Sequence, residues 1–218
     1  ALGKDGGYTS DVIQGIYECI NKSTEFNIST ISMSLGTSST YASSCDAEFE
    51  YYTQAIASAT AQNISVIAAT GNAYTTNQIS SPACISHVIP VGSINTTNGV
   101  SSFSNRDSSV KLFAPGENIN STSYDGSYTE MSGTSMATPI ISGIFLLMQE
   151  YLDKAEVNLA PLEKESLVYE TGVAVTDADN PGEDFRTFNI TKLFQNLSNT
   201  YCQPNLINTT WSPAYNNG

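Results

Sequence analysis

The chain has 218 residues, of which 40% are hydrophobic, and this length is enough for one domain with a sizeable core. Eight Lys and Arg stand against 21 Asp and Glu, and the formal net charge of −13 argues against nucleic acid or an anionic membrane surface as a partner. No apolar run approaches the roughly 20 residues of a membrane span, so we expect no membrane partner.

The first third of the chain alternates helix and strand patterns. Apolar residues recur at helical spacing over residues 8–21 and again over residues 46–62. Residues 28–35 alternate apolar and small polar side chains, as a strand does. Residues 64–69 form a nearly continuous apolar strand, which is typical of a strand covered on both faces. This alternation predicts right-handed crossovers in a mostly parallel sheet, and therefore an α/β fold.

The remainder of the chain continues with shorter elements. They are predicted as strands at 88–92, 110–113 and 119–123, and as helices at 138–151, 161–169 and 189–197. From Tyr201 onward the chain is rich in Pro, Asn and Thr, and we interpret it as a tail or linker. The expected organisation is one domain over residues 1–200 and a tail over residues 201–218.

The stretch MSGTSMATPIISG, from Met131 to Gly143, places a serine at the beginning of an apolar helix. Gly133 lets the backbone turn sharply. Ser135 then lies beside the free N–H groups and the positive dipole end of the helix, which can stabilise an oxyanion. This is a suitable setting for a nucleophile. The same pattern also fits an ordinary N-cap serine, so the local sequence leaves both interpretations open.

Two early strands end in small polar segments. AATGN ends the strand at 64–69 with Asn72, and SMSLG, residues 32–36, ends the preceding strand. In open parallel sheets, sites lie at the carboxyl ends of the strands. The side-chain amide of Asn72 is therefore placed where it can donate a hydrogen bond into a cleft shared with Ser135. An ordinary strand-ending turn is the alternative interpretation of Asn72.

Seven segments together resemble successive landmarks of one family, the subtilisin-like serine peptidases. In chain order they are SMSLG, AATGN, SSPAC…HVIPVGS, SSFSN, FAPGENI, GTSMATP and ETGVAV…D. The resemblance extends from Leu2 to about Phe194. It implies a three-layer subtilisin-like fold with a mostly parallel sheet. It also implies a serine endopeptidase that hydrolyses its polypeptide substrate through an acyl-enzyme intermediate.

The resemblance assigns roles by position. Ser135 matches the nucleophile. Asn72 matches the asparagine of the oxyanion hole, whose removal in subtilisin costs roughly 2.7–4 kcal/mol. Two walls of the pocket for the residue before the scissile bond are also implied, and their small side chains leave room for a large apolar or aromatic substrate side chain. The first wall is Ser34, Leu35 and Gly36, and the second is Ala69, Thr70 and Gly71.

The proton-transfer residues of the family are not found in this sequence. The family's order is Asp, then His, then Ser, and neither of the first two motifs precedes Ser135. The single histidine, His87, matches a family position without a catalytic role. A chymotrypsin-like triad of His87, Asp125 and Ser135 needs an all-β fold, and an α/β-hydrolase needs a histidine after the serine. We therefore expect a fragment, the C-terminal part of a catalytic domain whose N-terminal portion is missing, with at most feeble activity alone.

Two other functions remain as alternatives. The first is a catalytically inactive subtilase-like binding protein that has lost its Asp or His, although a dead site has no chemical reason to keep both Ser135 and Asn72. The second is a secreted glycoprotein without a catalytic site, which only the amino-acid composition supports. Ile140 and Ile141 replace a His-Val pair that is frequent in the family. That is a helix packing position, so little effect on the chemistry is expected.

Four cysteines without C-x-x-C spacing argue against a zinc site, and either two disulfides or buried free thiols fit their number. The family resemblance implies a Cys45–Cys84 disulfide. Cys19 and Cys202 are expected to pair with each other or with missing sequence. Calcium is common in the family, but the sequence shows no complete ligand set, so we predict neither a metal site nor another cofactor. A propeptide and the missing N-terminal segment are further implied partners.

Sequons for N-glycosylation are more frequent than expected. Chance would give roughly four, and the sequence contains twice that number. Together with the even number of cysteines and the acidic composition, they favour a secreted, disulfide-bonded glycoprotein. The sequons are at Asn21, Asn27, Asn63, Asn95, Asn120, Asn189, Asn196 and Asn208.

Overall fold

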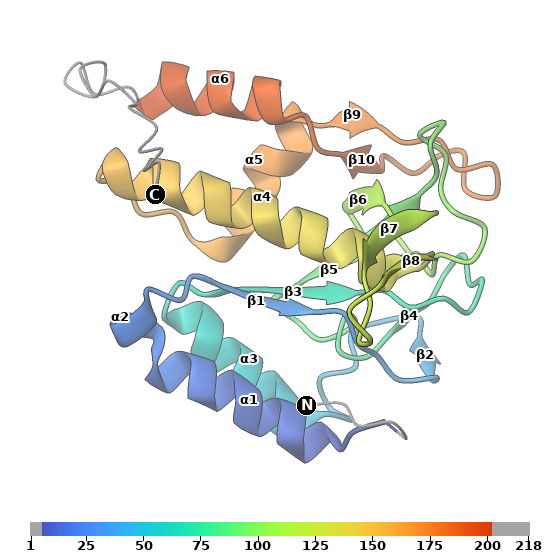
Figure 1. Ribbon diagram of the computed structural model, residues 1–218, viewed down its shortest axis with the longest axis horizontal. Helices are drawn as coiled ribbons and strands as arrows, with labels where there is room; N and C mark the ends of the chain where they lie inside the picture. Colours follow the sequence, from blue (N-terminus) through green and yellow to red (C-terminus); the bar gives the residue numbers. More distant parts are fainter. Residues whose placement is uncertain (1–5, 202–218) are drawn as a thin grey trace.

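The computed structural model describes residues 6–201, which form three layers around a mostly parallel sheet (Figure 1). The six strands have the order β1-β3-β5-β6-β10-β9, and every neighbouring pair is parallel except β9 and β10. The expected α/β fold is confirmed. The strands are β1 (Thr30–Met33), β3 (Ser65–Ala69), β5 (Val88–Ile94), β6 (Leu112–Pro115), β9 (Val173–Ala174) and β10 (Arg186–Thr187).

Helices cover both faces of the sheet (Figure 1). They are α1 (Thr9–Asn21), α2 (Ser23–Phe26), α3 (Glu50–Ala61), α4 (Thr134–Lys154), α5 (Pro161–Thr171) and α6 (Ile190–Tyr201). On one face, α1 packs against α3, and α3 packs against β3. On the other face, α4 crosses β1, β3, β5 and β6, while α5 and α6 pack against each other.

Strand β3 explains why the molecule has two cores. All five of its residues are buried. Val66 and Ala68 belong to the apolar cluster under α1 and α3, whereas Ile67 belongs to the cluster under α4. Because successive side chains of a strand point to opposite faces, a strand covered on both faces is apolar at nearly every position, and Ser65 is the one polar residue of β3. The continuous apolar run of this segment therefore predicted its central place correctly.

Two small antiparallel pairs flank the main sheet. Strand β2 (Thr40–Tyr41) pairs with β4 (Ile79–Ser80). Strand β7 (Ile119–Thr122) pairs with β8 (Tyr128–Met131), and this hairpin leads directly into α4. The first strand of the hairpin was predicted from the sequence, but its partner was not. The partner carries Tyr128, Glu130 and Met131 on exposed positions, so it has no alternation of buried and exposed residues to detect.

Three predicted boundaries were wrong by four residues, and other ends differ by one to three. Helix α3 begins at Glu50, because the carboxylate of Asp46 accepts hydrogen bonds from the backbone N–H and hydroxyl of Ser86 instead of capping a helix. Helix α4 begins four residues before the predicted Thr138. Helix α6 extends to Tyr201, which the sequence analysis assigned to the tail. The rest of the predicted tail, residues 202–218, lies outside the described residues.

A disulfide ties the segment before α3 to the loop between β4 and β5. Its sulfurs belong to Cys45 and Cys84, the pair that the family resemblance implies, and are 1.96 Å apart. Cys19 is half-buried on α1, and its predicted alternative partner Cys202 is not among the described residues. Within residues 6–201, no helix combines the length and the apolar character that a membrane crossing requires.

Candidate active site

The carboxyl end of β3 meets the beginning of α4, as expected for a site in a parallel sheet. The Oδ1 atom of Asn72 accepts hydrogen bonds from the backbone N–H of Thr134 at 2.9 Å and from its hydroxyl at 3.0 Å. The same hydroxyl accepts a bond from the N–H of Gly71 at 3.1 Å. Asn72 and the residue before Ser135 are thus joined directly, although 62 positions separate them in sequence.

This contact makes Asn72 the cap of α4. The residue at the N-cap position is Gly133, which has no side chain to cap the helix, so the amide oxygen of Asn72 satisfies the first N–H from outside. The Nδ2 group of Asn72 makes no hydrogen bond to any residue between 6 and 201 and remains available as a donor. Asn72 is exposed and Ser135 is half-buried, so both are accessible to a bound molecule.

The carbonyl of Ser135 is bonded to the segment just after β1 instead of to its own helix. Pro139 lies inside α4 four positions after Ser135 and has no N–H, so the usual helical donor to the Ser135 carbonyl is missing. The hydroxyl of Ser34, just after β1, donates to this carbonyl at 2.7 Å. The sequence of α4 thus creates an acceptor that the end of β1 satisfies, and this fixes Ser34 beside Ser135.

Two glycines allow the close approach of these segments. Gly71 has φ +99°, and a Cβ there would lie 2.4 Å from the hydroxyl oxygen of Ser80. A Cβ on Gly116 would lie 2.7 Å from the carbonyl oxygen of Gly133, whose N–H bonds to the Gly116 carbonyl at 2.8 Å. A larger residue at either position would displace the backbone that carries Asn72 or Ser135.

The two predicted pocket walls both rest against β4. A Cβ on Gly36 would lie 3.6 Å from the Cβ of Ser80, the same residue that Gly71 approaches from the other side. Leu35 and Gly36 also line a cavity of about 70 Å³ with Tyr52 and Pro82. On the second wall Ala69 and Thr70 are buried. The structure thus brings Ser34–Gly36 and Ala69–Gly71 to one region beside Ser135.

The single histidine lies at the opposite end of the sheet. His87 immediately precedes β5, whose first residue pairs with Val66 near the beginning of β3. The four residue steps along β3 span about 13 Å, and Asn72 lies beyond the far end. His87 lines a cavity of about 420 Å³ with Lys111 and Glu165. It is therefore not placed to exchange a proton with Ser135.

Asp125, the acid of the alternative triad, occupies the turn between β7 and β8. Its carboxylate accepts hydrogen bonds from the backbone N–H and hydroxyl of Ser127, which lower the pKa of this exposed carboxyl. It closes a local turn and does not contact His87 or Ser135. Within residues 6–201 no three His, Cys, Asp or Glu side chains are grouped as metal ligands, so we assign no residue to calcium.

Sequence analysis missed two residues of this region. Thr134 was read only as part of the GTSMATP motif, yet its N–H and hydroxyl link Asn72 to Gly71. Asn105 ends the SSFSN segment, where only the family resemblance marks it, yet its side chain bonds both sides of the turn that carries Asn72. An asparagine at the end of a small polar run was the available signal, but its side-chain partners in the turn and in β4 lie 25 to 35 positions away.

Comparison with known sequences identifies one family. Residues 1–188 match the sequence model of the Subtilase family. The chain is similar to an intracellular serine protease of Paenibacillus polymyxa, with 38% identity over 154 residues that cover 68% of this chain and 44% of the relative. It is also similar to the minor extracellular protease Epr of Bacillus subtilis (strain 168), with 33% identity over 159 residues, 73% of this chain and 23% of the relative.

A solved structure agrees with these sequence relatives. A cold adapted subtilisin-like serine proteinase superposes with a TM-score of 0.66 at 34% identity, covering 86% of this chain and 63% of that one. The chain spans less than half the length of the two curated relatives. By their names, one of those relatives is intracellular and the other extracellular, so similarity does not determine where this protein resides.

Proposed function

The chain belongs to the subtilase family, and from this membership we propose that it carries the nucleophile, the oxyanion donors and the pocket walls of a serine endopeptidase. The observation that carries the proposal is the bonding of Asn72 to the first turn of α4. Because Thr134 occupies Oδ1 of Asn72, Nδ2 is left to donate toward a substrate beside Ser135.

In the proposed reaction Ser135 Oγ attacks the carbonyl carbon of a peptide bond. The negative oxygen of the tetrahedral intermediate accepts hydrogen bonds from Asn72 Nδ2 and from the Ser135 N–H, which has no acceptor within its own helix. The amine leaves with a proton, and an ester to Ser135 remains. Water then attacks this ester, which releases the new carboxylate and returns the proton to Ser135.

The proton carrier in this scheme is a histidine–aspartate pair from polypeptide outside these 218 residues. His87 is at the wrong end of the sheet, and Asp125 is engaged with its own turn. On their own, these residues retain the oxyanion donors but lack the base, which lowers the rate by orders of magnitude.

Labelling by a fluorophosphonate, which reacts with activated serines, tests this function. We expect the full-length gene product to be labelled at Ser135, and residues 1–218 alone to be labelled weakly. The variant Ser135→Ala should abolish labelling. Ser132→Ala, which removes a neighbouring serine whose hydroxyl accepts only the N–H of Asn118, should not. A folded full-length protein without label would favour the alternative, an inactive subtilase-like binding protein.

The oxyanion role of Asn72 has its own test. We expect Asn72→Ala to lower kcat about 10²–10³-fold with little change in KM, because the lost hydrogen bond acts mainly on the transition state. Asn77→Ala, an exposed asparagine in the same segment, is the matched control. Equal kinetics for Asn72→Ala and the wild type would remove Asn72 from the mechanism.

The substrate preference follows from the pocket walls. Gly36, Ala69 and Gly71 have little or no side chain, so the pocket they border accepts a large apolar or aromatic residue before the scissile bond. A series of peptides that differ only at this residue measures the preference through kcat/KM. Faster hydrolysis after small or charged residues would contradict it.

Secretion is proposed on separate grounds. The Cys45–Cys84 disulfide supports an oxidising compartment, and the numerous sequons support glycosylation there. Protein from the native host should show a Cys45–Cys84 peptide under non-reducing conditions and a loss of mass on enzymatic deglycosylation. Alkylation of Cys45 without a reductant would argue against this compartment.

A further inference from the structure

A single buried residue holds the turn that carries Asn72. Oδ1 of Asn105 accepts hydrogen bonds from the N–H groups of Ala73 at 2.7 Å and Thr75 at 3.3 Å. Its Nδ2 donates to the carbonyl of Thr70 at 3.1 Å, and its own N–H donates to the carbonyl of Gly71 at 2.9 Å. The backbone on both sides of Asn72 is thus bonded to one side chain that is fully shielded from solvent.

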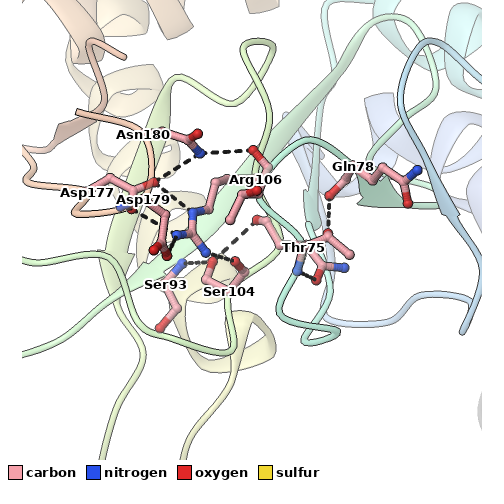
Figure 2. Close-up of polar contacts among 10 residues, drawn as sticks. Thr75, Gln78, Ser93, Ser104, Arg106, Asp177, Asp179 and Asn180 are labelled. Atoms are coloured by element: carbon pink, nitrogen blue, oxygen red, sulfur yellow. Dashed lines mark hydrogen bonds and ion pairs between the residues drawn. The ribbon is translucent and has the colours of Figure 1, made fainter. Parts of the chain in front are cut away.

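The next residue anchors Asn105 through a buried ion pair (Figure 2). The guanidinium of Arg106 donates to Asp177 from Nε at 2.7 Å and from Nη2 at 2.8 Å. It also donates to Asp179 at 2.7 Å and to the carbonyl of Ser104 at 3.0 Å. The side chains of Arg106 and Asp177 are only 2% and 3% exposed, so water screens the pair little.

The segment that supplies these carboxylates also touches the turn directly. Nδ2 of Asn180 donates to the carbonyl of Thr76 at 2.9 Å, and the N–H of Arg106 donates to the carbonyl of Thr75 at 3.1 Å. A continuous set of hydrogen bonds therefore runs from residues 177–180, through Arg106 and Asn105, to the backbone around Asn72.

We propose that Asn105 is a positioning residue that fixes the Asn72 amide for catalysis, and that the Arg106–Asp177 pair keeps Asn105 in place. This inference rests on the proposed function, because only there does Asn72 donate a hydrogen bond to a reacting substrate. Asn72 itself is exposed, and its side chain is bonded only at Oδ1, so the direction of Nδ2 depends on the backbone that Asn105 holds. A displacement of an ångström or less is enough to weaken an oxyanion hydrogen bond.

Two variants of Asn105 separate the effect of its Oδ1 acceptor from that of its Nδ2 donor. Asn105→Ala removes every side-chain hydrogen bond. We expect kcat of the full-length protein to fall roughly 10–100-fold, which at most reaches the lower bound of the loss expected from deleting the oxyanion donor itself. Asn105→Asp keeps the acceptor for Ala73 and Thr75 but loses the Nδ2 donors. We expect a smaller loss of kcat for Asn105→Asp, with KM nearly unchanged in both variants.

A double-mutant comparison tests whether Asn105 acts through Asn72. In an Asn72→Ala background, we expect Asn105→Ala to lower kcat by less than about threefold, because the group being positioned is already absent. The control for general destabilisation is Val168→Ala. Val168 is buried in the apolar cluster under α4 and does not contact the turn that carries Asn72. This variant should lower the unfolding temperature without changing kcat at low temperature.

Amide hydrogen exchange at Ala73 and Thr75 gives a result that does not need activity. We expect Asn105→Ala to accelerate exchange at these two amides at least tenfold, and Val168→Ala to leave it unchanged. An inactive wild type would overturn the proposed function, and exchange would still show whether Asn105 holds the turn. Unchanged exchange, or independent losses of kcat in the double mutant, would overturn the positioning role. If Asn105→Ala does not fold, Asn105→Asp decides through the double-mutant comparison: a loss of kcat that disappears in the Asn72→Ala background supports the positioning role, and an independent loss overturns it.

Discussion

Two cations are buried within residues 6–201, and they differ in what surrounds them. Arg106 is 2% exposed and donates to two carboxylates and a backbone carbonyl. Lys164 on α5 is 1% exposed, and its Nζ has no hydrogen-bond partner within residues 6–201. Burial lowers the pKa of Lys164, and the charge of Asp153 only partly opposes this. The first cation is built into the candidate site, whereas the second lies in the packing of a peripheral helix.

The difference shows that the effect of a buried charge on stability depends on whether a partner is buried with it. Removing one partner of a fully desolvated pair leaves the other charge uncompensated, and this is strongly destabilising. A buried ammonium without a hydrogen-bond partner has no such pair to lose, and its burial is itself a cost. Although Arg106 and Lys164 are similarly buried, we therefore expect substitution to lower stability at Arg106 and not at Lys164.

The largest effect is expected at Arg106. Arg106→Met should lower the free energy of unfolding by about 3–5 kcal/mol, because it leaves Asp177 buried without its partner. Urea denaturation of residues 1–218 followed by circular dichroism measures this. A loss below about 1 kcal/mol would mean that water or a rearranged loop satisfies Asp177, and the contrast with Lys164 would disappear.

A smaller effect with a distinct pH signature is expected at Asp177. Burial raises the pKa of this carboxyl, but the hydrogen bonds and charge of Arg106 outweigh burial and lower it below its ordinary 3.8. Its contribution to stability is therefore complete above about pH 4 and is lost as the pH falls through the lower folded-state pKa. Asp177→Asn should cost about 1.5–3 kcal/mol at pH 7.

Unfolding measured from pH 7 down to pH 2 provides the check. The wild type should lose the contribution of Asp177 in the acid range, whereas Asp177→Asn should lack that component and approach the wild type at the lowest pH. Parallel curves for the two proteins would show that Asp177 does not ionise differently in the folded and unfolded states.

Asp179 should matter less although it bonds the same guanidinium. Its side chain is 66% exposed, and exposed ion pairs contribute little because water solvates the carboxylate in both states. Asp179→Ala should cost less than about 1 kcal/mol, and most of this effect should disappear in high salt. A cost as large as that of Asp177→Asn would show that the two carboxylates act as one unit.

The smallest effect is expected at Lys164. Lys164→Met keeps most of the buried stem and removes the ammonium, so the free energy of unfolding should stay unchanged or rise by about 1 kcal/mol. The same urea experiment measures it beside Arg106→Met. A clear loss of stability would reveal a partner for the ammonium and would make the two buried cations alike.

The sequence predicted the elements whose side-chain pattern reflects burial. Residues 64–69 and 88–92 are apolar because both faces of the sheet are covered, and residues 8–21 are amphipathic because one face of α1 is buried. The strands at 173–174 and 186–187 were missed, since two residues are too few to show a period. Their place in the sheet is set by pairing, of β10 with β6 and of β9 with β10, which local sequence does not encode.

The candidate site was predictable in its parts but not in its connections. Local motifs at a helix start and a strand end single out Ser135 and Asn72 as candidates, while their roles come from the family resemblance and stay predictions. The start of α4 at Thr134 depends on a cap from Asn72, and the burial of Arg106 depends on Asp177, 71 positions later. Such pairings are chosen by the folded chain, so no window of sequence contains them.

The proline in α4 also has a consequence for how the protein matures. Pro139 leaves the Ser135 carbonyl to be satisfied by Ser34, and Asn72 must arrive to cap the same turn. During synthesis, residues 34 and 72 leave the ribosome well before residue 135. Ser135 therefore reaches its final geometry only after both earlier strands have docked against α4, and in a nascent or partly folded chain the first turn of α4 lacks both of these bonds.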